Sequence, residues 1–114
     1  MIRTPLTYYE RVMCWNWCGL QQVASLREAA TYIRLIEKLR PTDAEMRETQ
    51  FATTEQGFKW NVPQHGYGNK VVNLEDSEAE ALKATLEAQQ NIRVSDAEWM
   101  LRLTESLTPV EVPA

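Results

Sequence analysis

The sequence has 114 residues, of which 44% are nonpolar and 25% charged, and its net charge is −4. This is the length and composition of one ordinary folded domain, which needs neither a metal nor a disulfide to form a core. The excess of acid lies in residues 41–114, which hold thirteen Asp and Glu but six Arg and Lys. Because proteins bind duplex DNA by neutralising its phosphates, this balance argues against duplex DNA as a partner.

Residues 1–5 are expected to form a loose start, with Pro5 at or near the first turn of a helix. Nonpolar residues then recur at helical spacing, which predicts a helix over 8–18 with Gly19 as its stop. Charged and polar residues interrupt this nonpolar stretch. Neither a membrane span nor a secretory signal is therefore expected, and the cytoplasm is the favoured location.

The predicted first helix is rich in aromatic residues. Trp15 and Trp17 are two positions apart, which separates them by about 200° around a helix. Trp, Tyr and Arg dominate the energetics of protein interfaces. One hypothesis is therefore a protein-docking surface made of Tyr8, Tyr9, Arg11, Trp15 and Trp17. The alternative is that this helix packs on two sides within the fold.

The two cysteines, Cys14 and Cys18, are four positions apart on the same predicted helix. A helical backbone does not favour a disulfide at this spacing, and the single histidine, His65, leaves too few ligands for a structural zinc site. We expect two buried thiols in a reducing compartment. Every nucleophile would depend on His65, which lies in a Gly/Pro-containing loop, so the sequence predicts no enzyme, no metal and no cofactor.

A second helix is predicted from Ser25, which stands three residues before Glu28 in a capping-box pattern, to Arg40, which precedes Pro41. Its nonpolar positions form an unusually wide stripe. The stripe consists of Leu26, Ala29, Ala30, Ile33, Ile36 and Leu39, widened by Tyr32 and Leu35. This width suggests burial on two sides, either in the core or against another subunit, and a homo-oligomer is expected.

The capping-box pattern recurs at Thr42 and Glu45, at Ser77 and Glu80, and at Ser95 and Glu98. It predicts a short helix over 43–49, a longer helix that fades near 90–91, and a last helix. In the last helix, Trp99, Met100, Leu103 and Leu107 are expected to face inward. The tail, residues 108–114, is expected to be disordered.

Four acidic residues, Glu75, Asp76, Glu78 and Glu80, lie close together around the predicted start of the longer helix. General acid–base catalysis needs carboxylates in unlike, partly buried surroundings. At a helix N-terminus, negative charge is favoured by the helix dipole alone. We interpret these carboxylates as structural.

Between the short and the longer helix the chain changes character. Two β-prone runs, 51–54 and 58–61, flank Gln56-Gly57 and predict a hairpin. A loop follows over 62–69, and residues 71–74 predict a third short strand. The predicted fold class is mainly α with a small β-hairpin or three-strand insert at about 51–74 (α+β). Residues 1–107 are expected to form a single compact domain.

A second candidate site combines rings with cations. Trp60, His65, Tyr67 and Lys70 lie in or beside the predicted loop, and Arg27 and Arg34 lie on the second helix. Rings that stack on bases and cations that meet phosphates suit a small nucleotide, such as a second messenger. The alternative is a hairpin whose Trp60 covers the edge of the core.

Four segments carry a resemblance to a known group of proteins: 25–30 (SLREAA), 39–45 (LRPTDAE), 57–61 (GFKWN) and 71–74 (VVNL), the last before a Glu-rich helix. In this order they resemble short accessory proteins of tailed phages and prophages. The resemblance runs from Gly19 to Leu107 and implies a viral protein that acts on a host factor or an antiviral system in the host cytoplasm. The group has no assigned reaction, so it supplies no functional residues. The expected function is inhibition or sequestration of a host protein through the aromatic helix, with nucleotide binding as the alternative.

Overall fold

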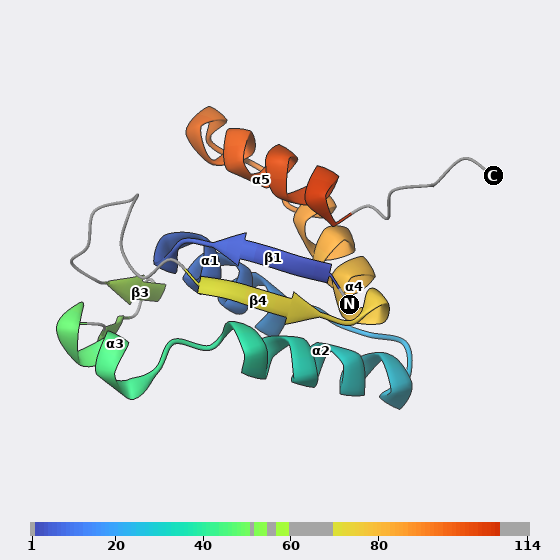
Figure 1. Ribbon diagram of the computed structural model, residues 1–114, viewed down its shortest axis with the longest axis horizontal. Helices are drawn as coiled ribbons and strands as arrows, with labels where there is room; N and C mark the ends of the chain where they lie inside the picture. Colours follow the sequence, from blue (N-terminus) through green and yellow to red (C-terminus); the bar gives the residue numbers. More distant parts are fainter. Residues whose placement is uncertain (1, 51, 55–56, 60–69, 108–114) are drawn as a thin grey trace.

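The computed structural model describes residues 2–50, 52–54, 57–59 and 70–107 (Figure 1). In chain order the elements are β1 (Ile2–Leu6), α1 (Tyr8–Gly19), α2 (Leu26–Leu39), α3 (Asp43–Glu48), β2 (Ala52–Thr54), β3 (Gly57–Lys59), β4 (Lys70–Leu74), α4 (Asp76–Glu87) and α5 (Val94–Ser106). Five helices and two small antiparallel sheets confirm the predicted α+β class and its compact, mainly helical character.

The N-terminal strand corrects the expectation of a loose start. β1 pairs antiparallel with β4, with Thr4 opposite Val72 and Pro5 opposite Val71. The Asn73 carbonyl accepts a hydrogen bond from Lys38 of α2 at 3.0 Å, so the backbone there points away from β1. Val71 lies two positions before Asn73 on β4, so the backbone of Val71 and of its partner Pro5 has the same orientation. The amide hydrogen that Pro5 lacks would therefore not have reached β4, which is why this strand tolerates a proline.

The predicted third strand is therefore the partner of the N-terminus and not of the hairpin. The hairpin itself is confirmed: β2 and β3 pair antiparallel, with Thr54 opposite Gly57. In the described residues the two sheets share no strand. The predicted insert thus consists of a short hairpin followed by a strand that belongs to the main body of the fold.

Capping decides where the first three helices begin. Thr7 caps α1: its hydroxyl accepts from the Glu10 amide at 3.1 Å, and the Glu10 carboxylate accepts from the Thr7 amide at 3.0 Å. Thr42 and Glu45 close the same reciprocal box at α3. The predicted start of α2 at Ser25 is also confirmed, because its hydroxyl accepts from the Glu28 amide. Each cap satisfies amide hydrogens that a helix leaves unpaired.

The predicted starts of the last two helices are wrong. The cap of α4 is Glu75, two residues before the expected cap Ser77, and the helix begins at Asp76. The Glu78 carboxylate accepts a hydrogen bond from the Glu75 amide at 2.8 Å and so closes the first turn. α5 begins at Val94, so Ser95 lies inside the helix and caps nothing. α4 ends at Glu87, slightly before the expected fade near 90–91.

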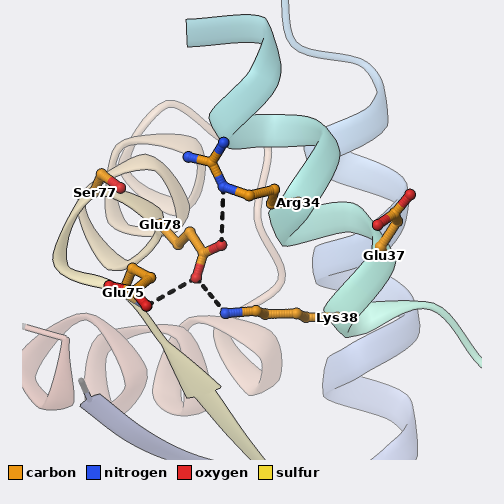
Figure 2. A pocket seen from close by; sticks show the side chains of 6 residues that line it. All are labelled: Arg34, Glu37, Lys38, Glu75, Ser77 and Glu78. Carbon is orange, nitrogen blue, oxygen red and sulfur yellow. Dashed lines mark hydrogen bonds and ion pairs between the residues drawn. The ribbon is translucent and has the colours of Figure 1, made fainter. Parts of the chain in front are cut away.

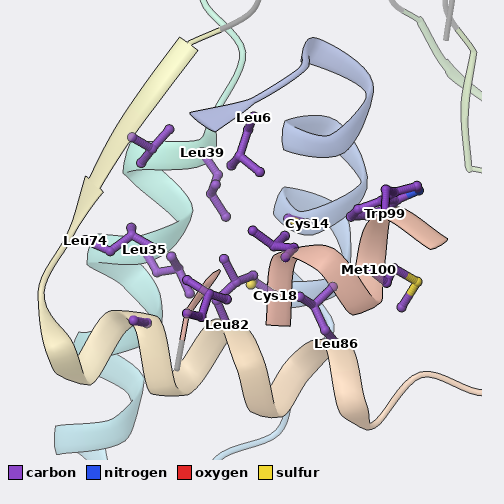
Figure 3. Packing of buried hydrophobic residues seen from close by; sticks show 14 residues of the cluster. Leu6, Cys14, Cys18, Leu35, Leu39, Leu74, Leu82, Leu86, Trp99 and Met100 are labelled. Atoms are coloured by element: carbon purple, nitrogen blue, oxygen red, sulfur yellow. The ribbon is translucent and has the colours of Figure 1, made fainter. Parts of the chain in front are cut away.

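The core lies where α1, α2, α4 and α5 meet beneath the β1–β4 sheet (Figures 1 and 3). Its buried members are Leu6, Cys14, Cys18, Leu35, Leu39, Val72, Leu74, Ala79, Leu82, Leu86, Trp99, Met100, Leu103 and Leu107. The inward orientation predicted for the four α5 residues is confirmed, and both cysteines are buried free thiols. Burial raises the pKa of the Cys18 thiol to about 12. No described helix is long and nonpolar enough to cross a membrane.

Candidate binding surface

Two of the five residues predicted to form an aromatic docking surface lie in the interior. Tyr8 and Arg11 are completely buried. The Tyr8 hydroxyl bonds to the Thr49 hydroxyl at 3.1 Å, and the Arg11 guanidinium donates to both Glu45 oxygens at 2.7 and 3.1 Å and to the Arg40 carbonyl at 3.2 Å. The prediction is wrong for these two because α3 packs over the start of α1. Arg11 therefore ties α3 to α1 within the chain.

Tyr9 and Trp17 are packed within the chain against α5. The Trp17 and Trp99 rings stack with centroids 5.9 Å apart and planes within 5°. The Tyr9 ring meets Trp99 edge-on at 6.3 Å, and its hydroxyl donates to Asp96 at 2.9 Å. Asp96 also accepts from the Trp99 indole at 3.1 Å. These contacts support the alternative stated above, a first helix packed on two sides within the fold.

Trp15 is the predicted surface residue that does line an open groove. The groove, of about 230 Å³, lies between the end of α1 and the last turn of α2 and is lined by Trp15, Asn16, Gly19, Leu20 and Ile36. We call it the α1–α2 groove. Leu20, just beyond the end of α1, is 70% exposed. The groove therefore combines the half-buried side chains of Trp15 and Ile36 with the exposed side chain of Leu20.

The wide stripe predicted on α2 is covered on one side only. Leu35 and Leu39 are fully buried in the core, which confirms that side. On the other side Leu26 is 90% exposed and Ile33 is 57% exposed. In Figure 1, α2 runs along an edge of the molecule with no described element beyond it. Within the described residues, three of the eight stripe residues, Leu26, Ala30 and Ile33, are exposed.

Arg34, a residue of the predicted nucleotide site, lies at a charged cavity between α2 and α4 (Figure 2). Its neighbour Glu78 is fully buried and accepts from Lys38 at 2.6 Å, while the Arg34 Nε lies 3.6 Å from the second oxygen of Glu78. Burial by itself raises the pKa of Glu78, but the hydrogen bonds from Lys38 and the Glu75 amide and the charges of Lys38 and Arg34 together hold it below its ordinary value of 4.5. This cluster ties α2 to β4 and α4, which agrees with the structural role expected for Glu78.

The cavity is a poor place for a phosphate. Its volume is about 560 Å³ and its lining residues are Arg34, Glu37, Lys38, Glu75, Ser77 and Glu78. Three carboxylates oppose two cations, so an anion gains little by entering. Of the other predicted ligand residues, Arg27 is exposed on α2 outside this lining and Lys70 is exposed on β4. Trp60, His65 and Tyr67 lie outside the described residues.

Asn16, Gly19, Leu20 and Ile36 belong to the groove but were not predicted as site residues. Gly19 was interpreted as a helix stop and Ile36 as part of the stripe. One signal was available: Leu20 is a large nonpolar residue directly after the predicted stop, where a polar residue is the usual choice.

In the described residues, no group of three or more His, Cys, Asp or Glu side chains is placed to hold a metal ion. Comparison of the chain with protein-family models, with curated proteins and with solved structures found no match.

Proposed function

We propose that this protein acts by binding, not by catalysis, and that it docks on a protein of a host cell through the α1–α2 groove. The observation that carries the proposal is the position of Leu20, 70% exposed beside the half-buried Trp15 and Ile36. A large nonpolar side chain in water beside a concave nonpolar floor is typical of a surface that a partner covers.

The size and chemistry of the groove favour a protein over a small ligand. Its volume of about 230 Å³ is smaller than the roughly 300–1,000 Å³ typical of small-molecule pockets, and it suits one nonpolar side chain of a partner. No residue of its lining titrates near neutral pH, and none is a nucleophile or a cation. Binding is therefore better supported here than either catalysis or the capture of a nucleotide.

The resemblance to short phage and prophage accessory proteins supports a partner in the host cytoplasm. Small phage proteins of this kind often act on host factors or antiviral systems, so inhibition or sequestration of a host protein, such as a component of antiviral defence, is the proposed outcome. The groove supplies the contact for this role. It replaces the aromatic surface predicted from the sequence, of which only Trp15 lines it.

Gly19 provides a sharp test of the groove. A Cβ added at Gly19 meets nothing within 4 Å, so a side chain there extends into open space beside the groove without displacing the fold. Gly19→Glu places a charge in a nonpolar contact, whereas Gly19→Ala is the matched control. Both variants should fold like the native chain.

The experiment places a photo-crosslinking benzoylphenylalanine at Leu20 in bacterial cells, and separately at Leu101, which is 65% exposed on α5. We expect one protein to be crosslinked from position 20 but not from position 101. The adduct should persist with Gly19→Ala and fall at least about tenfold with Gly19→Glu, which corresponds to about 1.4 kcal/mol of binding. An adduct formed equally from position 101, or unchanged by Gly19→Glu, would contradict the proposal.

A further inference from the structure

The uncovered side of α2 has the spacing of a helix that pairs with another helix. Leu26, Ala30, Ile33 and Glu37 follow one another at intervals of four, three and four residues. This is the repeat at which side chains interdigitate along a two-helix seam. All four are exposed, and Leu35, on the opposite side of α2, is fixed in the core. We call these four residues the α2 ridge. It is separate from the α1–α2 groove.

The ridge is shaped for close approach of a second helix. Ala30, the smallest of its residues, lies between the two large nonpolar residues Leu26 and Ile33. A small residue lets two helix backbones come near each other, and the flanking larger side chains then pack beside the partner helix. An antiparallel copy of the same ridge supplies the complementary shape, because Ala30 of one helix then lies opposite Ile33 of the other.

Two charges at the ends of the ridge identify the partner. The side chains of Arg27 and Glu37 have no hydrogen bond or ion pair to any described residue. They are ten residues apart, or roughly 15 Å along the helix. In an antiparallel pair with Ala30 opposite Ile33, each Arg27 lies beside Glu37 of the second helix. A parallel pair would instead set Arg27 against Arg27 and Glu37 against Glu37.

We propose that the α2 ridge pairs with the α2 ridge of a second copy of this chain, antiparallel and about a two-fold axis. In such an isologous pair each contact occurs twice, so the two Arg27–Glu37 pairs and the two Ala30–Ile33 contacts follow from one another. The two-fold axis is perpendicular to the paired helices and places both α1 helices on the same side. The two α1–α2 grooves then lie on one side of the dimer.

The experiment measures the mass of the purified chain by sedimentation velocity over a wide concentration range. The native protein is expected to sediment as a dimer that dissociates on dilution. Ile33→Glu should sediment as a monomer, and Leu101→Glu, a matched change of an exposed nonpolar residue on α5, should remain a dimer. Thermal unfolding of each variant shows that it is folded.

Charge exchange tests the antiparallel arrangement. Arg27→Glu and Glu37→Arg each place like charges together, and each should raise the dissociation constant at least about tenfold. The double variant restores opposite charges in both pairs and should return to the native affinity. A native chain that stays monomeric, equal loss of dimer with Leu101→Glu, or a double variant no better than the single ones would overturn the proposal. Crosslinking from the groove is read separately, so either proposal can fail while the other stands.

Discussion

α1 and α2 both carry more nonpolar surface than one helix face can bury, but the fold treats them differently. α2 packs on one side of α1 and α5 covers another, where Trp17 stacks on Trp99. α2 is buried along Leu35 and Leu39 and left open along Leu26 and Ile33. The number of rings on a helix therefore does not identify an interface. What decides is whether the chain supplies a second element to cover them.

The largest expected effect comes from removing the ring of α5 that covers α1. Trp99 is 4% exposed and contacts both Tyr9 and Trp17. Trp99→Ala should lower the free energy of unfolding by about 3–5 kcal/mol, because it empties a large buried volume and removes both ring contacts. Ile33→Ala, on the open side, should change it by less than about 0.5 kcal/mol at a dilution where the native chain is monomeric. Urea unfolding measures both, and equal losses would show that Ile33 is covered within the chain.

The next effect concerns the buried cation of α1. Arg11→Ala leaves Glu45, whose side chain is 19% exposed, without its bidentate partner. Because Glu45 keeps some contact with water, we expect a loss of about 2–3 kcal/mol, below the full value for breaking a buried pair. Arg47→Ala removes an exposed arginine of α3 and serves as the control in the same unfolding measurement. A loss below about 0.5 kcal/mol for Arg11→Ala would contradict its placement in the interior.

A smaller effect is expected from acid. The pKa of Glu78 is below its ordinary value of 4.5 in the folded chain, so its ionised form stabilises the fold above that pH. This contribution is lost as the pH falls through the folded pKa, when Glu78 takes up a proton. Glu78→Gln should be less stable than the native chain at neutral pH, and the difference should shrink below about pH 4.5. Glu80→Gln, an exposed control on α4, should parallel the native chain at every pH. A Glu78→Gln deficit that is constant with pH would contradict the account.

The smallest effect concerns the α1–α2 groove. Gly19→Ala removes a glycine from the last position of α1 at a site where an added Cβ meets nothing. It should raise stability by at most about 1 kcal/mol, since Ala has the higher helix propensity. Thermal unfolding measures the change. A destabilised Gly19→Ala variant would show that the groove is narrower than described.

Local signals predicted much of this fold, and long-range contacts account for most of the errors. The caps at Thr42 and Ser25 involve residues three apart, so the sequence alone located α2 and α3. The pairing of β1 with β4 joins residues nearly seventy positions apart in the sequence, and Pro5 taken by itself favoured a helix start. Ser77 and Ser95 fit the capping pattern as well as the true starts do. The competing box at Glu75 forms through Glu78, which also meets Lys38 of α2.

The candidate site was predictable only in part, for the same physical reason. The width of the α2 stripe indicated a second contact, and Trp15 was identified as a surface residue. The burial of Tyr8 and Arg11 depends on α3, which packs on α1 through Glu45 and Thr49, 34 and 41 residues away. Helical periodicity describes one helix at a time, so it cannot show which of its faces a distant element covers.

The central claim is that α1 packs its Tyr9 and Trp17 rings inside the chain whereas α2 presents its open side to another chain. The most direct test compares Trp17→Ala and Ile33→Glu with the native chain at a temperature where all are folded. Sedimentation mass is measured at a concentration where the native chain is a dimer, and stability at a dilution where it is a monomer, because dimer formation itself stabilises the folded chain. The account predicts that Trp17→Ala is less stable but keeps the dimer mass, and that Ile33→Glu keeps its stability but loses the dimer. A Trp17→Ala variant of native stability that becomes a monomer, with Ile33→Glu destabilised and still a dimer, would contradict it.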